Sequence, residues 1–224
     1  IGGSYAGLSA AMTLGRSLKK VLIIDSGKPC NRQTPHSHNF ITQDGLPPKQ
    51  IADAAKDQVL KYHTVTFHED VAIGAANAEN DFIISTQSGE SFAATKLLFA
   101  TGISDQMLEI SGFAECWGIS VLHCPYCHGY EVKHKPIGVI ANGDLGFEFS
   151  RLIHNWSKNL VLLTNGQSTL NLDQTEKIKQ HNIEIIEKEI VEIEHNQCYI
   201  TNVVFKYGSK QKLAEVFAKG GFKQ

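Results

Sequence analysis

The first part of the chain shows a helical pattern of apolar residues followed by a short apolar run. Across residues 6–18 the apolar side chains recur every three or four positions, which predicts an amphipathic helix. The run at residues 20–25 is apolar except at its ends, as is typical of a strand buried on both faces of a parallel sheet. A helix directly before such a strand predicts the centre of a β–α–β unit.

The same pattern returns after residue 112. A predicted strand at residues 136–141 leads through a glycine turn into a helix at about residues 145–155, and residues 160–164 form the next predicted strand. We therefore expect a second β–α–β unit. The other predicted elements are helices at residues 48–62 and 173–181 and strands at residues 65–68, 81–86, 91–94, 96–100, 183–186, 189–194 and 202–207.

These patterns predict an α/β protein with two Rossmann-like dinucleotide-binding domains of the three-layer ββα type. The chain begins with Ile1 rather than Met, and residues 217–224 form no closing helix or strand in the pattern, so we expect a piece truncated at both ends. The polar, proline-containing segment 26–48 is too long for an ordinary connection, which is typical of a functional loop.

Composition narrows the class of partner. Of the 224 residues, 42% are hydrophobic and 20% are charged, and the formal net charge is −2. These values are typical of a folded domain and disfavour nucleic acid as a partner. The longest apolar runs are far shorter than the roughly 20 residues needed to cross a bilayer, so we expect no membrane partner and a soluble, cytoplasmic protein.

The glycine turn at residues 2–7 lies between the end of a strand and the start of a helix. A dinucleotide fingerprint needs glycines in such a turn, and the helix N-terminus then holds the phosphates. Ser4 occupies the middle glycine position, where its hydroxyl can donate to a phosphate oxygen. Asp25 closes the next strand, where an acidic side chain binds a ribose hydroxyl. The alternative is a turn that only packs the helix on the sheet.

A second glycine turn, at residues 141–146, also joins a strand to a helix, with Ala141 at the first glycine position. Asn142, Gly143 and Asp144 are its candidate nucleotide contacts. The strand that follows ends without an acid for a 2′-hydroxyl or an arginine for a 2′-phosphate, so the sequence does not choose between NADH and NADPH. A purely structural turn is again the alternative.

Of the five cysteines, only Cys124 and Cys127 are closely spaced. Two cysteines separated by two residues at a helix start can form a small disulfide, and the helix dipole lowers the pKa of the first thiol. We therefore predict a redox-active disulfide and no metal site. Three alternatives are half of a zinc site with Cys116, His123 and His128, a covalent haem attachment, and a pair of inert buried thiols.

The order of these motifs resembles the low-molecular-weight thioredoxin reductase family of FAD-dependent pyridine nucleotide-disulfide oxidoreductases. The Cys-Pro-Tyr-Cys-His form at residues 124–128 is especially similar to a thioredoxin-reductase-like branch that includes fungal dithiol oxidases. The resemblance implies an FAD-binding domain at residues 1–111, an NAD(P)-binding domain with the cysteine pair at residues 112–215, and the start of a returning FAD-domain segment at residues 216–224.

The family also implies roles for individual residues. Cys127 would face the flavin, and Cys124 would attack a substrate disulfide. His128 stands where the family has an aspartate, and we expect its pKa to suit proton transfer near neutral pH. NADPH or NADH would bind at the second turn. His38 and Asn39 either touch a cofactor ring or only solvate their loop. The implied FAD contacts are Gly2, Ser4, Tyr5, Ala6, Asp25, Ser26, His38, Asn39, Val71, Thr101 and Gly102.

The resulting hypothesis is an enzyme that passes electrons from NAD(P)H through FAD to the Cys124–Cys127 disulfide and on to a thioredoxin-like protein or a small disulfide. The first alternative runs the same disulfide in reverse, as a dithiol oxidase with oxygen as acceptor. The second is a non-enzymatic nucleotide- or redox-sensing module. The family resemblance further implies a homodimer.

Overall fold

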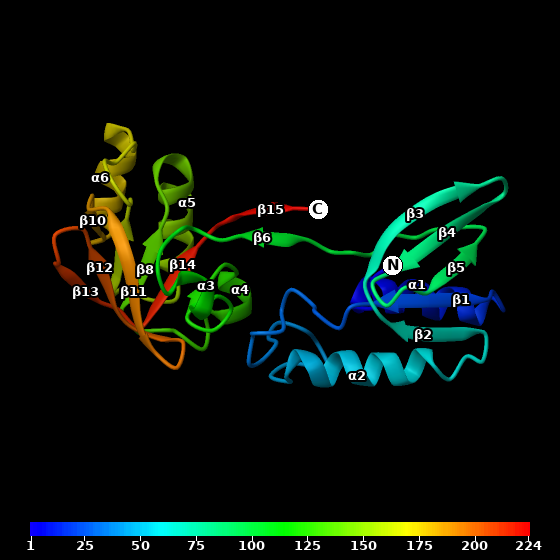
Figure 1. Cartoon of the computed structure of the whole chain (residues 1–224). Helices are drawn as coiled ribbons and strands as arrows, with labels where there is room; N and C mark the ends of the chain where they lie inside the picture. The colour runs from blue at the N-terminus through cyan, green and yellow to red at the C-terminus, as the bar shows by residue number, and fades with distance from the viewer. The chain divides into compact units, whose positions relative to one another are not determined.

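The computed structural model describes all 224 residues, and the chain divides into two compact units (Figure 1). Unit 1 comprises residues 1–32, 46–104 and 223–224, and unit 2 comprises residues 33–45 and 105–222. The long segment predicted as a functional loop is therefore shared, because residues 33–45 pack with unit 2. None of the helices combines the length and the apolar character that a bilayer span requires.

Unit 1 contains the predicted first β–α–β unit. Helix α1 (Tyr5–Arg16) precedes strand β1 (Val21–Asp25), which pairs in parallel with β2 (Val65–Glu69). Helix α2 (Pro48–Val59) starts at a proline, whose fixed φ suits the first turn of a helix. The apolar faces of these elements meet in one small core, formed by Leu8, Ala11, Ile23, Val59 and Val65.

A three-stranded antiparallel sheet follows in unit 1, made of β3 (Ala72–Ala78), β4 (Asp81–Thr86) and β5 (Ser91–Ala94). The sequence predicts β4 and β5, and the structure confirms both. It does not predict β3, because the small residues of that strand are almost all exposed and give no alternation of apolar and polar positions.

The predicted buried strand at residues 96–100 is wrong. The segment has no strand structure, and Leu98 and Phe99 are 49% and 68% exposed. Its backbone bonds only to Ile1, which donates to the Leu98 carbonyl at 2.7 Å and accepts from the Ala100 amide at 2.7 Å. One residue of pairing does not build a ladder, so the apolar pattern is present without the neighbouring strand that would bury it.

Unit 2 is built on a five-stranded parallel sheet with strand order β10-β9-β8-β14-β7. Helices α5 (Gly143–Ile153) and α6 (Leu172–Gln180) pack together beside it. A capping box between Asn171 and Gln174 starts α6. The strands are β7 (Val121–Leu122), β8 (Ile137–Ile140), β9 (Leu160–Leu163), β10 (Glu184–Ile186) and β14 (Glu215–Ala218).

An antiparallel sheet of β11 (Ile190–Asn196), β12 (Tyr199–Phe205) and β13 (Lys210–Lys212) covers the other face. Alternate residues of β14 show the layering, because Val216 and Ala218 join the core shared with β11 and β12, whereas Phe217 joins the core under α5 and α6. Figure 1 shows these elements of unit 2 with the parallel strands between helices and antiparallel sheet. The predicted three-layer ββα fold is confirmed.

Strand β14 was not predicted. It lies between β8 and β7 and pairs in parallel with both, so the boundary expected between residues 215 and 216 falls inside a strand of the central sheet. The remaining elements are short: β6 (Ser104–Gln106) and β15 (Gly221–Lys223) form a two-stranded ladder, and α3 (Phe113–Cys116) and α4 (Pro125–His128) are single-turn helices.

Phe217 tests the position of β14. Its side chain is fully buried and meets Phe149 edge-to-face, with ring centroids 6.2 Å apart. Phe217→Ala should destabilise unit 2 by about 3–5 kcal/mol, because it removes a buried ring and leaves a cavity. The matched control is Phe222→Ala, since Phe222 is 65% exposed and should lose far less. Denaturant unfolding measures both variants, and equal losses would contradict the assignment of β14 to the sheet.

Candidate redox disulfide and dinucleotide turns

The first glycine turn brings α1 against the end of β1 at a distance that only glycine permits. A Cβ on Gly7 would lie 1.8 Å from the carbonyl oxygen of Gly2, and a Cβ on Gly2 would lie 2.2 Å from that of Ala100. Gly2 also has φ +98°, and its amide donates to the Ile24 carbonyl at 2.9 Å. The turn is therefore tight for the reason that a dinucleotide fingerprint requires.

Asp25 fixes this turn from the end of β1. One carboxylate oxygen accepts from the Gly3 amide at 2.7 Å, and the other accepts from the Gly27 amide at 3.0 Å. Each oxygen keeps a second lone pair that can accept from a ribose hydroxyl. Ser4, the N-cap of α1, makes no capping bond with its side chain, and no acidic residue lies in the first turn of α1. The turn thus fits the pyrophosphate and ribose of a dinucleotide.

The other residues expected to contact FAD differ in their exposure and in their hydrogen bonds. Ala6 and Ser26 are exposed near the turn, and the hydroxyl of Tyr5 donates to the Pro48 carbonyl at 3.5 Å. Thr101 is exposed, and Gly102 has φ +69° with open space on its Cβ side.

Both backbone groups of Val71, an expected FAD contact, already have hydrogen-bond partners. Its amide donates to the Asp70 carboxylate at 2.6 Å, and its carbonyl accepts from the Gln87 amide at 2.9 Å. His38 and Asn39 are not brought to the turn within unit 1, since both belong to unit 2. The predicted set is thus divided between the two units.

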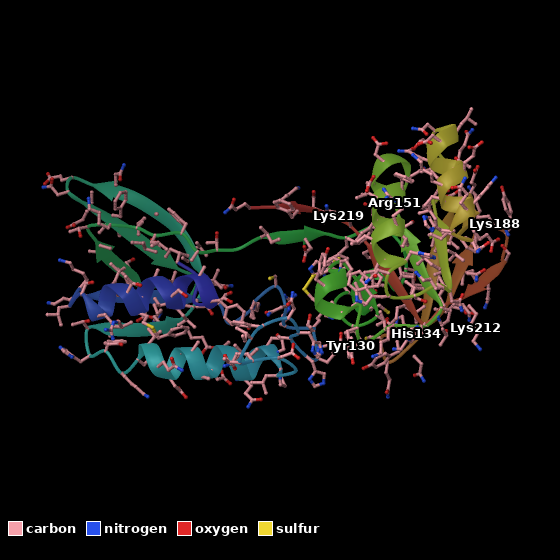
Figure 2. All side chains as sticks on the ribbon, turned by 180° about the vertical axis from the view of Figure 1, so that it is seen from behind. Tyr130, His134, Arg151, Lys188, Lys212 and Lys219 are labelled. Atoms are coloured by element: carbon pink, nitrogen blue, oxygen red, sulfur yellow. A yellow bond between two sulfur atoms is a disulfide. The ribbon has the colours of Figure 1, made fainter.

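Cys124 and Cys127 form the predicted disulfide in unit 2 (Figure 2), with their Cα atoms 5.3 Å apart. Cys124 is the N-cap of α4, Pro125 occupies its first position, and the Cys127 amide donates to the Cys124 sulfur at 3.2 Å. Because α4 has a single turn, its dipole is small. The group placed to stabilise negative charge on the Cys124 sulfur is therefore this one amide.

Aromatic residues hold the disulfide turn in place. A Cβ on Gly129 would lie 2.7 Å from the ring of Trp156, which also meets Tyr126 edge-to-face at 5.6 Å. On the other side, His123 stacks on Trp117 with centroids 5.4 Å apart. The sequence suggests only that the tryptophans are core or interface residues. The spacing of the tryptophans along the sequence does not indicate that they pack against the disulfide turn.

His128 differs from its expected chemistry. The pKa of its imidazole is lowered to about 4, mainly by burial and to a smaller extent by the nearby His123 and His38. The expectation of a pKa near neutrality is therefore wrong, because a half-buried imidazole between two other histidines disfavours the charged form. At neutral pH His128 is uncharged, so it can accept one hydrogen bond and donate another but has no extra proton to give.

The loop at residues 33–45 supplies His38, one of the two histidines near His128. His38 lies 3.6 Å from a carboxylate oxygen of Glu131 and 3.6 Å from one of Asp44, and the side-chain amide of Gln33 donates to the Ala114 carbonyl at 3.4 Å. A histidine predicted as a cofactor contact thus lies in unit 2 with the disulfide. Its separation in sequence from residue 128 is too large for any local pattern to link the two.

The second glycine turn is closed by its own side chains. The Asn142 side-chain oxygen accepts from the Gly143 amide at 2.8 Å and from both the amide and hydroxyl of Thr169, at 2.8 and 3.1 Å. Its NH₂ donates to the carbonyls of Gln167 at 2.9 Å and Thr164 at 3.4 Å. Asn142 therefore ties the turn to the segment after β9, and its side chain has little capacity left for a ligand.

The charge at this turn also fits a nucleotide poorly. Asp144, in the first turn of α5, accepts from the Gln174 side chain at 2.7 Å and places a carboxylate where a phosphate would bind. Residues 141–147 and 164–171 contain no lysine or arginine. Arg151, labelled in Figure 2, lies in the last turn of α5, at the far end of the helix. The residues of the second turn therefore do not fit NAD(P)H as well as those of the first turn fit a dinucleotide.

Comparisons with known proteins give a consistent family. Residues 1–223 match the family model of pyridine nucleotide-disulphide oxidoreductases. The chain is 36% identical over 178 residues to thioredoxin reductase tcpT of Claviceps purpurea, covering 76% of this chain and 56% of the relative. It is 35% identical over 180 residues to thioredoxin reductase aclD of Aspergillus oryzae, covering 76% of this chain and 57% of the relative. The chain thus spans little more than half of these relatives.

Solved structures agree with this result. The structure of a putative thioredoxin reductase TrxB from Bacillus anthracis superposes with a TM-score of 0.94 at 31% identity, covering 100% of this chain and 75% of that one. An oxidoreductase from Agrobacterium tumefaciens gives a TM-score of 0.91 at 35% identity, covering 99% and 73% of the two chains.

The neutral state of His128 predicts a pH dependence. Its folded pKa of about 4 lies below the ordinary value of 6.5, so the unfolded chain takes up a proton first as the pH falls. The stability contributed by this group is complete above about pH 6.5 and is lost as the pH falls toward about 4. NMR titration of its ring proton, assigned with His128→Gln, should show an inflection near pH 4, and an inflection near 6.5 would contradict the burial argument.

Proposed function

Because the chain belongs to the pyridine nucleotide-disulphide oxidoreductase family, we propose that it carries out FAD-dependent thiol–disulfide exchange at Cys124 and Cys127. FAD and NAD(P)H are the cofactors of the thioredoxin reductases in this family. The observation that carries the proposal is a disulfide held on a one-turn helix, in a chain whose N-terminal turn fits a dinucleotide.

Unit 1 supplies the residues that would hold FAD. The tight turn and the N-terminus of α1 would bind the pyrophosphate through backbone amides from Ser4 to Ala6, with the Ser4 hydroxyl as an additional donor, while the Gly3 amide stays with Asp25. Asp25 would accept from a ribose hydroxyl, and Thr101 and Gly102 lie open beside the turn. Bound FAD would supply a second carrier of an electron pair beside the Cys124–Cys127 disulfide, one that can exchange electrons with a nicotinamide or with oxygen.

The two cysteines divide the exchange between them. In the reductive direction, the Cys124 thiolate attacks a substrate disulfide, forming a mixed disulfide and releasing one substrate thiolate. Cys127 then attacks Cys124, releasing the second thiolate and closing the disulfide that the structure contains. Each substrate disulfide takes up two electrons, and the protein disulfide gains none until an external donor opens it again.

His128 takes part in this scheme as an uncharged hydrogen-bonding group. Its pKa of about 4 makes the imidazole too weak a base to hold the proton of a thiol that attacks the disulfide, so in the oxidative direction that proton passes to water. In the reductive direction the leaving thiolate takes its proton from water, because His128 is not protonated near neutral pH.

Exposed aromatic rings next to the disulfide offer a docking surface for the substrate. Tyr126 lies between the cysteines and is 63% exposed, and Tyr130 is 69% exposed in the turn after α4 (Figure 2). Large aromatic rings of this kind are enriched at protein interfaces. We propose a thioredoxin-like protein or a small disulfide as the substrate, with a homodimeric, cytoplasmic protein as the working form.

The second glycine turn favours a second candidate function. Its asparagine is fully bonded, its aspartate repels phosphate, and its neighbouring segments contain no cation. A protein with a weak NAD(P)H site can run the same disulfide in the opposite direction, as a dithiol oxidase that passes electrons through FAD to oxygen. A non-enzymatic sensing module is disfavoured, since the family consists of oxidoreductases.

Gly7 provides a test of the FAD turn. In Gly7→Ala the new methyl group overlaps the Gly2 carbonyl, so the turn must open and the content of bound FAD should fall by about tenfold or more. Gly74→Ala is the matched control, because nothing lies within 4 Å of its Cβ position. The flavin-to-protein absorbance ratio measures both variants, and full FAD retention by Gly7→Ala would show that the flavin does not use this turn.

The cysteine pair provides a test of the chemistry. Cys124→Ser and Cys127→Ser should each reduce turnover to less than about one-thousandth, because each removes one sulfur of the exchange. Cys30→Ser is the matched control, since Cys30 is a free, exposed cysteine. Turnover that survives in both disulfide variants would eliminate the proposed mechanism.

Anaerobic rapid mixing separates the two directions of electron flow in the same protein. A reductase should bleach the flavin absorbance on mixing with NADPH or NADH. An oxidase should bleach it only on mixing with a dithiol, and the absorbance should recover when air is admitted. Bleaching with none of these donors would refute both candidates.

A further inference from the structure

A cluster of metal-ligating side chains lies in unit 1, apart from the residues used above. His68 is at the end of β2, Asp70 lies in the connection to β3, and Glu90 lies in the hairpin between β4 and β5. One ligand atom from each of the three lies within 4.8 Å of the others. We propose that this cluster binds a divalent transition-metal ion of the zinc class, a site independent of the proposed redox function.

The spacing of the three atoms suits coordination. His68 Nε2 lies 2.9 Å from Glu90 Oε2 and 3.7 Å from Asp70 Oδ2. Ligand atoms that are about 2.0–2.2 Å from a zinc ion at tetrahedral angles are about 3.3–3.6 Å apart. These two distances lie on either side of this range, and the Asp70 and Glu90 oxygens lie within 4.8 Å of each other, so side-chain movements of about an ångström would bring all three atoms to one ion.

The state of the imidazole gives a second, independent observation. Nε2 of His68 is buried from solvent and makes no hydrogen bond, although a carboxylate oxygen of Glu90 lies 2.9 Å from it. The ring itself is fixed edge-on to Phe92, with centroids 4.9 Å apart. A buried polar atom without a partner is costly, and a metal ion between the nitrogen and the carboxylates would satisfy it.

Backbone hydrogen bonds hold the carboxylate of Asp70 in a fixed orientation. Its side chain is only 10% exposed and accepts from the amides of Val71 at 2.6 Å and Ser88 at 3.2 Å. The carboxylate is thus oriented by two backbone amides, as ligating carboxylates usually are by their neighbours.

The donor set indicates the kind of ion. One imidazole nitrogen and two carboxylate oxygens are typical zinc ligands, whereas calcium and magnesium prefer oxygen alone and copper(I) prefers sulfur. With a neutral imidazole the cluster carries a charge of −2, which a divalent ion balances. Glu90 is 58% exposed, so the fourth position faces solvent and would hold water. The ion would tie the hairpin at residues 86–90 to the end of β2, beside Val71.

The test uses the purified protein with its Cys124–Cys127 disulfide kept oxidised, so that these sulfurs do not bind metal. Titration with Co²⁺, a spectroscopic substitute for Zn²⁺, should produce visible ligand-field absorption that saturates at one ion per chain, and Zn²⁺ should displace it. Glu90→Gln, which preserves shape, and His68→Ala should each weaken binding by more than about tenfold.

The matched controls are Glu69→Gln and His63→Ala, which replace exposed residues of the same types close by. Both should bind Co²⁺ as the unchanged protein does. The proposal is overturned if the protein binds no Co²⁺ or Zn²⁺, as expected of a simple His68–Glu90 ion pair, or if binding persists in both Glu90→Gln and His68→Ala. Neither result affects the redox proposal, because no cysteine contributes to the cluster.

Discussion

The pairing of β14 with both β7 and β8 is the constraint on which the arrangement of unit 2 depends. All three strands are parallel, so the chain leaves β7 toward Cys124 and leaves β8 toward Asn142 at the same edge of the sheet. Neighbouring strands are about 4.8 Å apart, which places the disulfide turn and the second glycine turn roughly two strand spacings from each other. A buried strand near the end of the chain thus sets the spacing between the disulfide turn and the second glycine turn.

The sequence predicts those parts of the fold in which local pattern and final environment agree. Helix α1 has a strong helical period and strand β1 a continuous apolar run, and both elements lie where these patterns predict them. Strand β3 is missed because small, exposed residues give no periodic signal. Residues 96–100 fail in the opposite way, since their apolar pattern is strong but only Ile1 pairs with them.

The candidate site also contains some features that local sequence predicts and others that only the folded chain assembles. A spacing of two residues between Cys124 and Cys127 is a local signal, and it predicts the disulfide that the structure contains. His123 directly precedes Cys124, whereas His38 comes from a distant segment, and only the folded chain brings His38 close enough to affect His128. A pKa depends on this assembled environment, which explains why the residue type alone gives the wrong value. The cluster of His68, Asp70 and Glu90 is hidden from sequence for the same reason.

We propose that the disulfide and a bound flavin exchange electrons within one protein. Anaerobic reductive titration of the FAD-loaded protein examines this exchange by counting the electron pairs that each chain accepts. We expect two pairs, one opening the Cys124–Cys127 disulfide and one reducing the flavin, and a single pair after replacement of Cys127 by serine. A full protein that accepts only one pair while its disulfide stays closed would show that the two groups do not exchange electrons.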